Sequence, residues 1–257
     1  MKRLSQDLRT SLWILGLLVQ RELKRQYKST TLGVLWLLVN PLIQMLVLTT
    51  VFSYIVRIEV ENYAPFVLAG LLPWMYFSQG VVSGTGSLIS CRDLIKKVHF
   101  PLILIPLSTL GSQLVAFLIA LSLLLLGFTL LFPFSTFIIL ILPAILLETI
   151  LLVGLASLLS AYDIFYRDVS YMLQSSVFVL FYLTPVLYPI SYIPDSFRFF
   201  YELNPLVGII GLYQTALTGT VHTSVEAVSL SVFASSLIFI VGLLVFGKRS
   251  RYFADWV

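Results

Sequence analysis

Long stretches without any Asp, Glu, Lys or Arg constrain this sequence more than any other feature. They are Ser29–Val56, Asn62–Cys91, His99–Leu147, Val169–Pro194, Leu203–Val225 and Ala227–Gly247. Only 11% of the 257 residues are charged and 59% are hydrophobic, whereas soluble domains carry about 25% charged residues. No soluble fold buries that much apolar surface, so lipid must cover much of it. The sequence therefore predicts an all-α membrane protein.

The charge-free stretches divide into six predicted spans. A span needs about 20 mainly apolar residues to cross about 30 Å of hydrocarbon. The stretch His99–Leu147 is too long for one span, and the sequence Phe132-Pro133-Phe134-Ser135 near its middle is typical of a tight turn. The six predicted spans are Ser29–Val56, Asn62–Cys91, residues 102–131, residues 136–161, Val169–Pro194 and Ala227–Gly247.

The Lys and Arg residues predict the orientation of these spans. With a cytoplasmic N-terminus, fourteen of the sixteen fall in cytoplasmic segments, and only Arg57 and Arg198 fall outside. Cytoplasmic loops of membrane proteins carry such an excess of positive charge. The split predicts an even number of spans with both termini in the cytoplasm. We expect one transmembrane domain, with a cytoplasmic interface helix (1–30), a six-span bundle (31–247) and a cytoplasmic tail (248–257).

The N-terminal segment is predicted to lie on the membrane surface. Apolar residues recur there at helical spacing, at Leu4, Leu8, Leu12, Leu15, Val19 and Leu23. A basic amphipathic helix of this kind places its apolar face in lipid and its basic face among headgroups. A signal peptide would need a cleavage site after its apolar core, but the sequence RELKR follows there instead.

Several enzyme classes lack their motifs in this sequence. There is no GxxxxGK[ST] phosphate loop, no HExxH and no GxSxG. Cys91 is the single cysteine, and the predicted topology places His99 and His222 on opposite sides of the membrane. We therefore expect no catalytic residue, no metal site and no bound cofactor on this chain.

Four sequence segments together resemble one known family. The resemblance covers residue 20 to the C-terminus and is to the permease subunit of ABC transporters that export cell-surface polysaccharides, namely O-antigen, teichoic acid and capsule exporters. The segments are RELKRQYKSTTLGVLW (21–36) with Asn40-Pro41, GLLPWMYF (70–77), LIKKVHFP (94–101), and DIFYRD (163–168) with TPVLYP (184–189) and Asn204-Pro205.

The resemblance implies an assembly and a substrate. It implies a homodimer in the cytoplasmic membrane of a bacterium, with a separate ATPase subunit that holds ATP and Mg²⁺. The substrate would be a polysaccharide on a polyprenyl-type lipid, moved outward from the cytoplasmic leaflet. The segment between spans five and six, Leu203–Val225, would form short re-entrant helices that act as an outer gate.

The loop between spans two and three is the candidate contact with the ATPase. The resemblance implies a coupling helix, because an ATPase stroke needs a rigid contact to move spans. The alternative is that the lysines only anchor the topology. The candidate coupling residues are Arg92, Asp93, Lys96, Lys97 and His99.

Basic residues in the last part of the interface helix have two interpretations. They could anchor headgroups, at about 1 kcal/mol each near anionic lipid. They could also bind the phosphate that links the lipid to its sugar. The candidate residues are Arg21, Lys24, Arg25 and Lys28.

Aromatic residues are the candidate lining of a sugar channel. Sugar C–H faces stack on aromatic rings, and tyrosine hydroxyls add hydrogen bonds without charge, so a polymer can slide past such a wall. The alternative is packing and interface belts. The candidates are Trp36, Phe52, Tyr54, Trp74, Tyr76, Phe77, Phe178, Phe181 and Tyr182, with Tyr188 beyond them.

Two other function classes stay open at the level of sequence. A membrane enzyme acting on a polyprenyl-linked or other lipid substrate would need clustered aspartates on the cytoplasmic side, where Asp163 and Asp168 are the only near pair. A proton-coupled carrier would depend on Glu148 inside span four. We favour a structural role for Glu148, as a hydrogen-bond partner of a neighbouring span.

Overall fold

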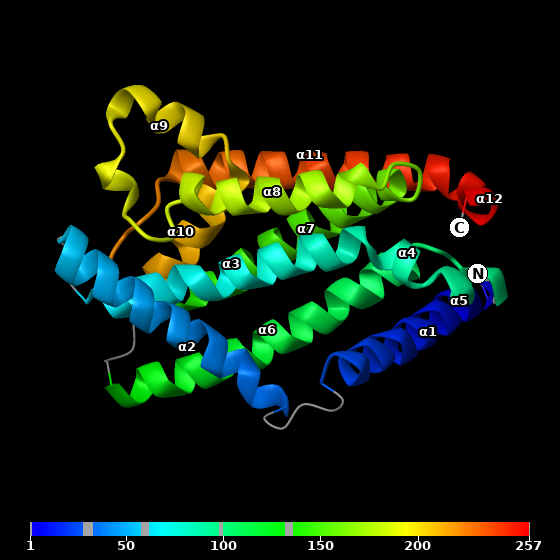
Figure 1. Ribbon diagram of the computed structural model, residues 1–257, viewed down its shortest axis with the longest axis horizontal. Helices are drawn as coiled ribbons and strands as arrows, with labels where there is room; N and C mark the ends of the chain where they lie inside the picture. Colours follow the sequence, from blue (N-terminus) through cyan, green and yellow to red (C-terminus); the bar gives the residue numbers. More distant parts are fainter. Residues whose placement is uncertain (1, 28–32, 58–61, 98–99, 132–135, 257) are drawn as a thin grey trace.

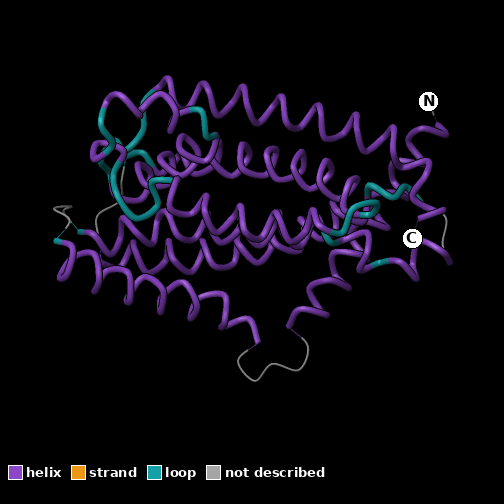
Figure 2. Tube along the Cα trace, turned by 45° about the horizontal axis from the view of Figure 1, so that its top comes forward, coloured by secondary structure: helices purple, strands orange, loops and turns teal. Residues whose placement is uncertain are grey.

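The computed structural model describes residues 2–27, 33–57, 62–97, 100–131 and 136–256 (Figure 1). Within these ranges the chain is helical and contains no β-strand, so the predicted all-α class is confirmed there. Most of the helices run side by side as an elongated bundle, with the chain termini at one end (Figures 1 and 2).

Five helical segments are long and apolar enough to cross a membrane. They are Trp36–Ser53, Tyr63–Thr85, Leu104–Phe128, Ile138–Asp163 and Val225–Tyr252. These segments correspond to predicted spans one, two, three, four and six. Helix α8 (Asp168–Leu183) occupies the position of the fifth predicted span but has only 16 residues. It ends at Thr184, which is extended because the following Pro185 disfavours helical geometry.

Helix α1 (Lys2–Tyr27) lies outside the bundle, where it packs mainly against α6 (Leu104–Leu131) (Figure 1). The approach is close, because a Cβ atom built on Gly111 would lie 2.9 Å from the Cγ2 atom of Val19. The last turn of α1 carries Lys24 and Arg25, which suit the negative end of the helix dipole.

Helix α3 (Tyr63–Thr85) forms the centre of the bundle. It packs against α6, α7 (Ile141–Asp163), α10 (Pro205–Thr218) and α2 (Trp36–Thr49). Most of its residues are buried, including its large aromatic side chains. Because it is apolar on all sides, burial around the whole helix is expected.

Helix α7 and helix α11 (Val225–Arg249) make the closest helix pair in the bundle. They meet at Gly154 and Gly242, where a Cβ atom on Gly154 would lie 2.6 Å from the Cα atom of Phe239. A Cβ atom on Gly242 would collide with the carbonyl of Gly154. Small residues allow such backbone contact between membrane helices.

Helix α2 differs from these helices because it is hardly buried. Pro41 is its only buried residue among those described. The helix continues as a wider π-helical turn (Thr50–Val56) and ends at Arg57, whose φ of 62° is left-handed. A left-handed residue is a common helix terminator.

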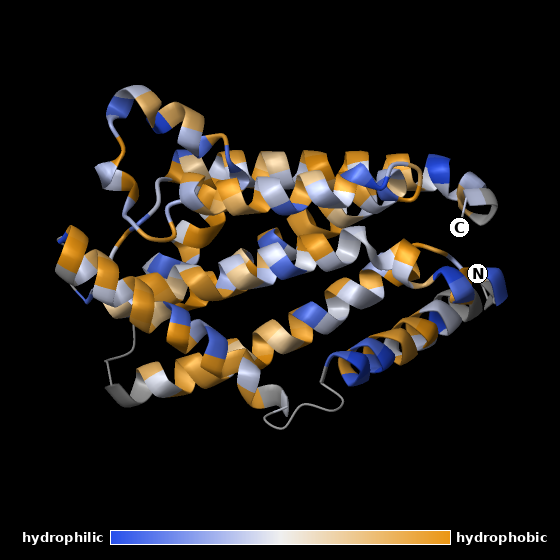
Figure 3. Ribbon diagram, in the orientation of Figure 1, coloured by the Kyte–Doolittle hydropathy of each residue, from blue (hydrophilic) through white to orange (hydrophobic). Residues whose placement is uncertain are grey.

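Several short elements lie at one end of the bundle. They are α4 (Ser87–Ser90), the basic helix α5 (Arg92–Lys97) and α12 (Phe253–Trp256), with the start of α1 (Figures 1 and 3). Helix α9 (Asp195–Glu202), which carries Arg198, lies at the opposite end. The structure thus places the basic helix α5 and helix α9 at opposite ends of the bundle.

The segment between α8 and α11 leaves and returns at the same end of the bundle. It holds α9 and α10, and α10 is buried continuously from Leu206 to Leu217 (Figure 1). Asn204 caps α10 by accepting a hydrogen bond from the backbone N–H of Leu206, and Pro205 is the first helical residue.

Buried side chains fix the irregular stretch after α8. The Tyr63 hydroxyl donates to the carbonyl of Leu187 at 2.7 Å. Nε2 of Gln214 donates to the carbonyl of Pro185 at 3.1 Å. These bonds satisfy backbone groups that have no helical partner and would otherwise be costly to bury. The stretch is therefore a defined structure tied to α3 and α10.

Candidate functional site

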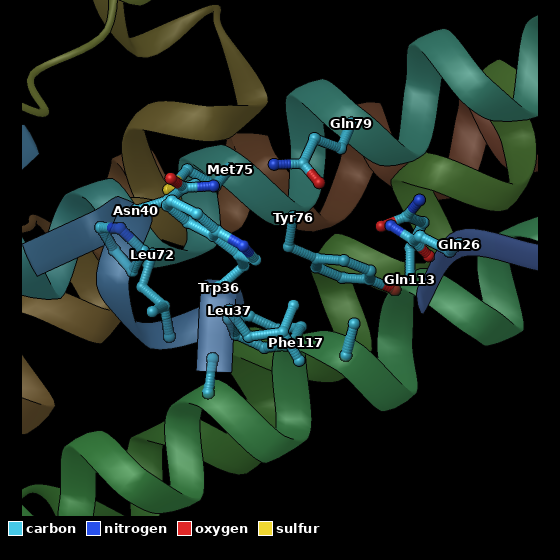
Figure 4. A pocket seen from close by; sticks show the side chains of 13 residues that line it. Gln26, Trp36, Leu37, Asn40, Leu72, Met75, Tyr76, Gln79, Gln113 and Phe117 are labelled. Carbon is cyan, nitrogen blue, oxygen red and sulfur yellow. The ribbon is translucent and has the colours of Figure 1, made fainter. Parts of the chain in front are cut away.

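A cavity of about 140 Å³ lies between the end of α1 and helices α2, α3 and α6 (Figure 4). We call it the carboxamide pocket. Its lining residues are Gln26, Trp36, Leu37, Asn40, Pro41, Leu72, Met75, Tyr76, Gln79, Gln113, Ala116, Phe117 and Ala120. Two of the predicted channel residues, Trp36 and Tyr76, are among them.

The carboxamide pocket combines aromatic faces with uncharged polar groups. The ring of Tyr76 stacks on Phe117 at 4.8 Å between centroids, and its hydroxyl lies 3.2 Å from the hydroxyl of Thr149. Four carboxamide side chains belong to the lining, and among the described residues it contains no Asp, Glu, Lys, Arg or His. Aromatic rings and amides suit a polyhydroxylated, uncharged ligand, because the rings accept C–H faces and the amides both donate and accept hydrogen bonds.

A second cavity, of about 280 Å³, contains the basic residues of α1. We call it the arginine pocket. Its lining residues are Arg21, Glu22, Arg25, Val82, Ser83, Gly86, Ser87, Ser90, Cys91, Thr109, Ser170 and Gln174. Helices α1, α3, α4, α6 and α8 thus contribute to it, with Cys91 at the C-cap of α4.

The two guanidinium groups of the arginine pocket have different partners. Nε of Arg25 donates to the carboxylate of Glu22 at 3.2 Å, and that hydrogen bond and charge raise the pKa of Arg25. Nη2 of Arg21 lies 3.2 Å from Sγ of Cys91, a weak acceptor. Arg21 is therefore the residue better placed to bind an added anion, since guanidinium groups pair with phosphate in a bidentate way.

The hydroxyl groups of the arginine pocket are bound to the chain itself. The Ser90 hydroxyl donates to the carbonyl of Gly86 at 2.8 Å, and the Ser170 hydroxyl donates to Oδ1 of Asp163 at 2.7 Å. Asp163 is buried and also accepts from the Ser170 backbone N–H at 3.1 Å. This carboxylate, which a membrane enzyme would have used, holds the start of α8.

Two other basic residues predicted for phosphate binding are placed differently. Lys24 is exposed on α1 and does not line the arginine pocket. Lys28 lies outside the described residues.

Five of the predicted channel residues form a row of aromatic contacts. Trp74 lies 5.7 Å from Phe77 and 5.3 Å from Phe181, by ring centroids. Tyr182 lies 5.4 Å from Phe181 and 5.5 Å from Phe178. The row therefore joins the core helix α3 to the outer helix α8.

Burial differs along this row. Trp74 and Phe77 are buried, as is the neighbouring Tyr76, whereas Phe178 and Tyr182 are 66% and 53% exposed. The exposed rings are therefore available to a substrate or a second chain, and the buried rings support them.

The remaining predicted aromatic residues belong to segments near the N-terminal end of α3. Phe52 is half-buried and lies 6.5 Å from Tyr63 between ring centroids. The side chain of Tyr54 lies outside the described part of the structure. Tyr188 is half-buried, and its hydroxyl donates to the carbonyl of Tyr182 at 2.7 Å.

The predicted coupling residues occupy the short helix α5. Its charged side chains are exposed, and Ile95 packs against a buried cluster that includes Ile164, Phe246 and Phe253. Helix α5 thus packs at the edge of a cluster that joins residues of α4, α6, α7, α11 and the C-terminal turn. The exposed charged residues are Arg92, Asp93, Lys96 and Lys97, and His99 lies outside the described residues.

Glu148 is buried and bonded to a neighbouring helix. The hydroxyl of Tyr213 on α10 donates to its Oε2 atom at 2.9 Å. Burial of a carboxyl group requires such a partner. This contact matches the structural role that we expected for Glu148.

Sequence reasoning missed the carboxamide residues. Amide side chains are unusual in or beside apolar stretches, and this could have indicated a binding site. The four residues concerned are Gln26, Asn40, Gln79 and Gln113. Pairing them required the tertiary structure, because they come from four helices.

A family model described as ABC-2 type transporter matches residues 15–218, most of the described bundle. The chain belongs to the ABC-2 type transporter family. This finding confirms the predicted relationship, and the motif segments that carried the resemblance fall within the matched residues. An ABC-2 permease is a transport subunit, and this one is a multi-pass membrane protein.

Curated relatives extend the similarity over almost the whole ABC-2 chain. It is 34% identical over 217 residues to the O-antigen export system permease protein RfbA of Myxococcus xanthus, covering 83% of this chain and 84% of that protein. It is 29% identical over 248 residues to RfbA of Klebsiella pneumoniae, covering 94% of each. The polysialic acid transport protein KpsM of Escherichia coli is 25% identical over 240 residues, covering 90% of this chain and 91% of KpsM.

Proposed function

We propose that this chain is the permease subunit of an ATP-driven exporter that moves lipid-linked polysaccharide across the cytoplasmic membrane. The cargo class is O-antigen, teichoic acid or capsule polysaccharide. The observation that carries this proposal is the similarity to O-antigen export permeases over 83–94% of the chain. The uncharged aromatic and carboxamide lining of the pocket in Figure 4 supports a sugar cargo.

The proposed topology has six spans and cytoplasmic termini. Helix α8 would supply the fifth span, completed by the irregular stretch that follows it. A 16-residue helix rises only about 24 Å, so the stretch after Thr184 would cover the remaining depth. Helices α9 and α10 would form the re-entrant outer gate, supported by their return to the same end of the bundle.

The proposed assembly is a homodimer with a separate ATPase subunit that binds ATP and Mg²⁺. Helix α5 would dock on the ATPase through its exposed charges. The packing of Ile95 against the buried cluster supports this role, because a movement of α5 would be passed through that cluster to the helices that share it.

The proposed polymer path runs along the exposed aromatic residues of α8. Around Phe178 and Tyr182 this helix also exposes Gln174, Ser175 and Ser176. Lipid disfavours that mixture, whereas a sugar polymer can use both the rings and the polar groups. The phosphate-linked end of the cargo would first meet Arg21 and Arg25 at the arginine pocket.

Co-purification and complementation test this proposal. The tagged chain should retain an ATPase subunit, and deletion of its gene should abolish surface polysaccharide while lipid-linked polymer accumulates inside the cell. Wild-type chain should restore export only when the ATPase is active. A chain that acts on the lipid substrate without any ATPase would instead support the membrane enzyme or the carrier.

A further inference from the structure

The carboxamide pocket and the arginine pocket are consecutive along the same helices. On α3, Gln79 lines the carboxamide pocket and Ser83 lines the arginine pocket. On α6, Gln113 lines the carboxamide pocket and Thr109 lines the arginine pocket. Each pair is four residues apart, or about 6 Å along the helix axis.

The order of the two pockets is the same on both helices. Helices α3 and α6 run in opposite directions through the bundle (Figure 1). The step from Gln79 to Ser83 and the step from Gln113 to Thr109 both lead toward the end where α4 and α5 lie. The arginine pocket therefore lies nearer that end, with the carboxamide pocket one helical turn deeper.

Helix α1 joins the two pockets at its last turn. Arg25 lines the arginine pocket and the next residue, Gln26, lines the carboxamide pocket. Only α2 is confined to the deeper site, to which it brings Trp36 and Asn40. The two pockets thus lie one helical turn apart, the first lined by Arg21, Arg25 and Glu22 and the second by uncharged amide and aromatic groups.

The deeper pocket is open and small. An enclosed cavity of about 150 Å³ holds one unsubstituted benzene ring, and this open pocket measures about 140 Å³, so one sugar ring could enter it only in part. Trp36, which is 39% exposed, can face the C–H surface of a pyranose while the carboxamides bind the hydroxyls, and the stacked and buried rings of Tyr76 and Phe117 support the site. Among the described residues the lining offers no charged group, so a sugar with an ionised group would be costly to place against them.

We propose that the two pockets together bind a glycosyl diphosphate, with phosphate at Arg21 and Arg25 and the directly attached neutral pyranose among Gln26, Gln79 and Gln113. In such a molecule the phosphate and the sugar ring are neighbours, as the pockets are. The proposal rests on the function proposed above and adds that the permease recognises the first sugar of its cargo, not only the lipid phosphate.

Binding of short prenyl probes tests this proposal on the full chain purified with its ATPase partner in nanodiscs. The probes are farnesyl diphosphate, farnesyl diphosphoglucose, farnesyl diphospho-N-acetylglucosamine and farnesyl diphosphoglucuronate. At least one neutral sugar should tighten binding about tenfold over farnesyl diphosphate, as expected for a few hydrogen bonds. The glucuronate probe should show no such gain.

Variants assign the two parts of the probe to the two pockets. Gln79→Ala with Gln113→Ala should remove the sugar gain and leave farnesyl diphosphate binding unchanged. Arg21→Ala should weaken every probe about tenfold or more. Gln44→Ala is the matched control, because Gln44 is an exposed glutamine on α2 outside both pockets. Retention of the ATPase shows that each variant is assembled.

Three results would overturn the proposal. They are equal binding of the sugar and sugar-free probes, a sugar gain that survives loss of both glutamines, and a gain for glucuronate equal to that for the neutral sugars. With any of them, export that still depends on the chain and its ATPase would leave the proposed function standing. Absence of such export would reject the proposed function itself.

Discussion

The helices around α3 and the helices at the margin of the bundle differ in how much of their surface is buried within the chain. Helix α10 is buried along nearly its whole length and α3 along most of it, whereas α8 has no buried residue and α2 has only Pro41. Both pairs are apolar, so hydrophobicity alone does not separate them. The difference indicates that α3, α7, α10 and α11 form a frame within one chain, while α2 and α8 present faces to something outside it.

Adding a methyl group to the frame should have the largest effect. Gly242→Ala places a Cβ atom against the carbonyl of Gly154, so α7 and α11 must separate. We expect a loss of about 3 kcal/mol or more in stability and little assembled protein. Gly247→Ala on the same helix is the control, because nothing lies within 4 Å of its Cβ position. Thermal unfolding in detergent measures both, and equal midpoints would contradict the frame.

Breaking the buried hydrogen bond of the frame should have the next largest effect. Tyr213→Phe leaves the carboxyl group of Glu148 without its partner at 2.9 Å. We expect a loss of about 1–3 kcal/mol, because a buried polar group is left unsatisfied. Tyr171→Phe removes a hydroxyl from a residue that is 72% exposed and should be neutral. Urea or thermal unfolding of the purified chain measures the stability of both variants. If neither variant is less stable than the wild type, this hydrogen bond does not stabilise the frame.

The exposed face of α8 should behave in the opposite way. Tyr182→Ala should change stability by less than about 0.5 kcal/mol but reduce polysaccharide export severalfold, because a polymer contact is lost. Phe233→Ala on α11, which removes a ring that is 67% exposed, should leave export unchanged. Surface polysaccharide per assembled permease is the measurement. Unchanged export in both variants would remove α8 from the polymer path.

The smallest structural effect is expected at α5. Lys96→Glu combined with Lys97→Glu changes exposed charges and should not disturb the Ile95 contact with the buried cluster. We expect normal folding and a reduced stimulation of the partner's ATPase by substrate. Steady-state ATP hydrolysis by the purified complex tests this. Full stimulation would leave these lysines as topology anchors only.

Local signals were sufficient for most of the bundle. Five spans follow from the apolar stretches alone, because a run of about 20 apolar residues is typical of a transmembrane helix. Val169–Pro194 was predicted as one span because it carries no charge, but the helix inside it ends at Leu183, shortly before Pro185. Apolarity identified the segment, and the chemistry of one proline set its length.

The candidate site was predictable only in part. The sequence indicated Arg21, Arg25 and Trp36, because basic and aromatic residues stand out against an apolar background. It did not indicate that Trp74 and Phe77 would be buried, since an aromatic residue in a span can face lipid, a channel or the core. That choice depends on which helices become neighbours, which is a property of the whole fold.

ATP-driven transport in reconstituted vesicles tests the central claim most directly. The purified chain and its ATPase partner would be placed in liposomes with fluorescent polyprenyl-linked polysaccharide in the outer leaflet, and ATP would be added outside. We predict that polymer becomes protected inside the vesicles only when ATP, the ATPase and this chain are all present. Protection without ATP, or none in the complete system, would contradict the assignment as an export permease.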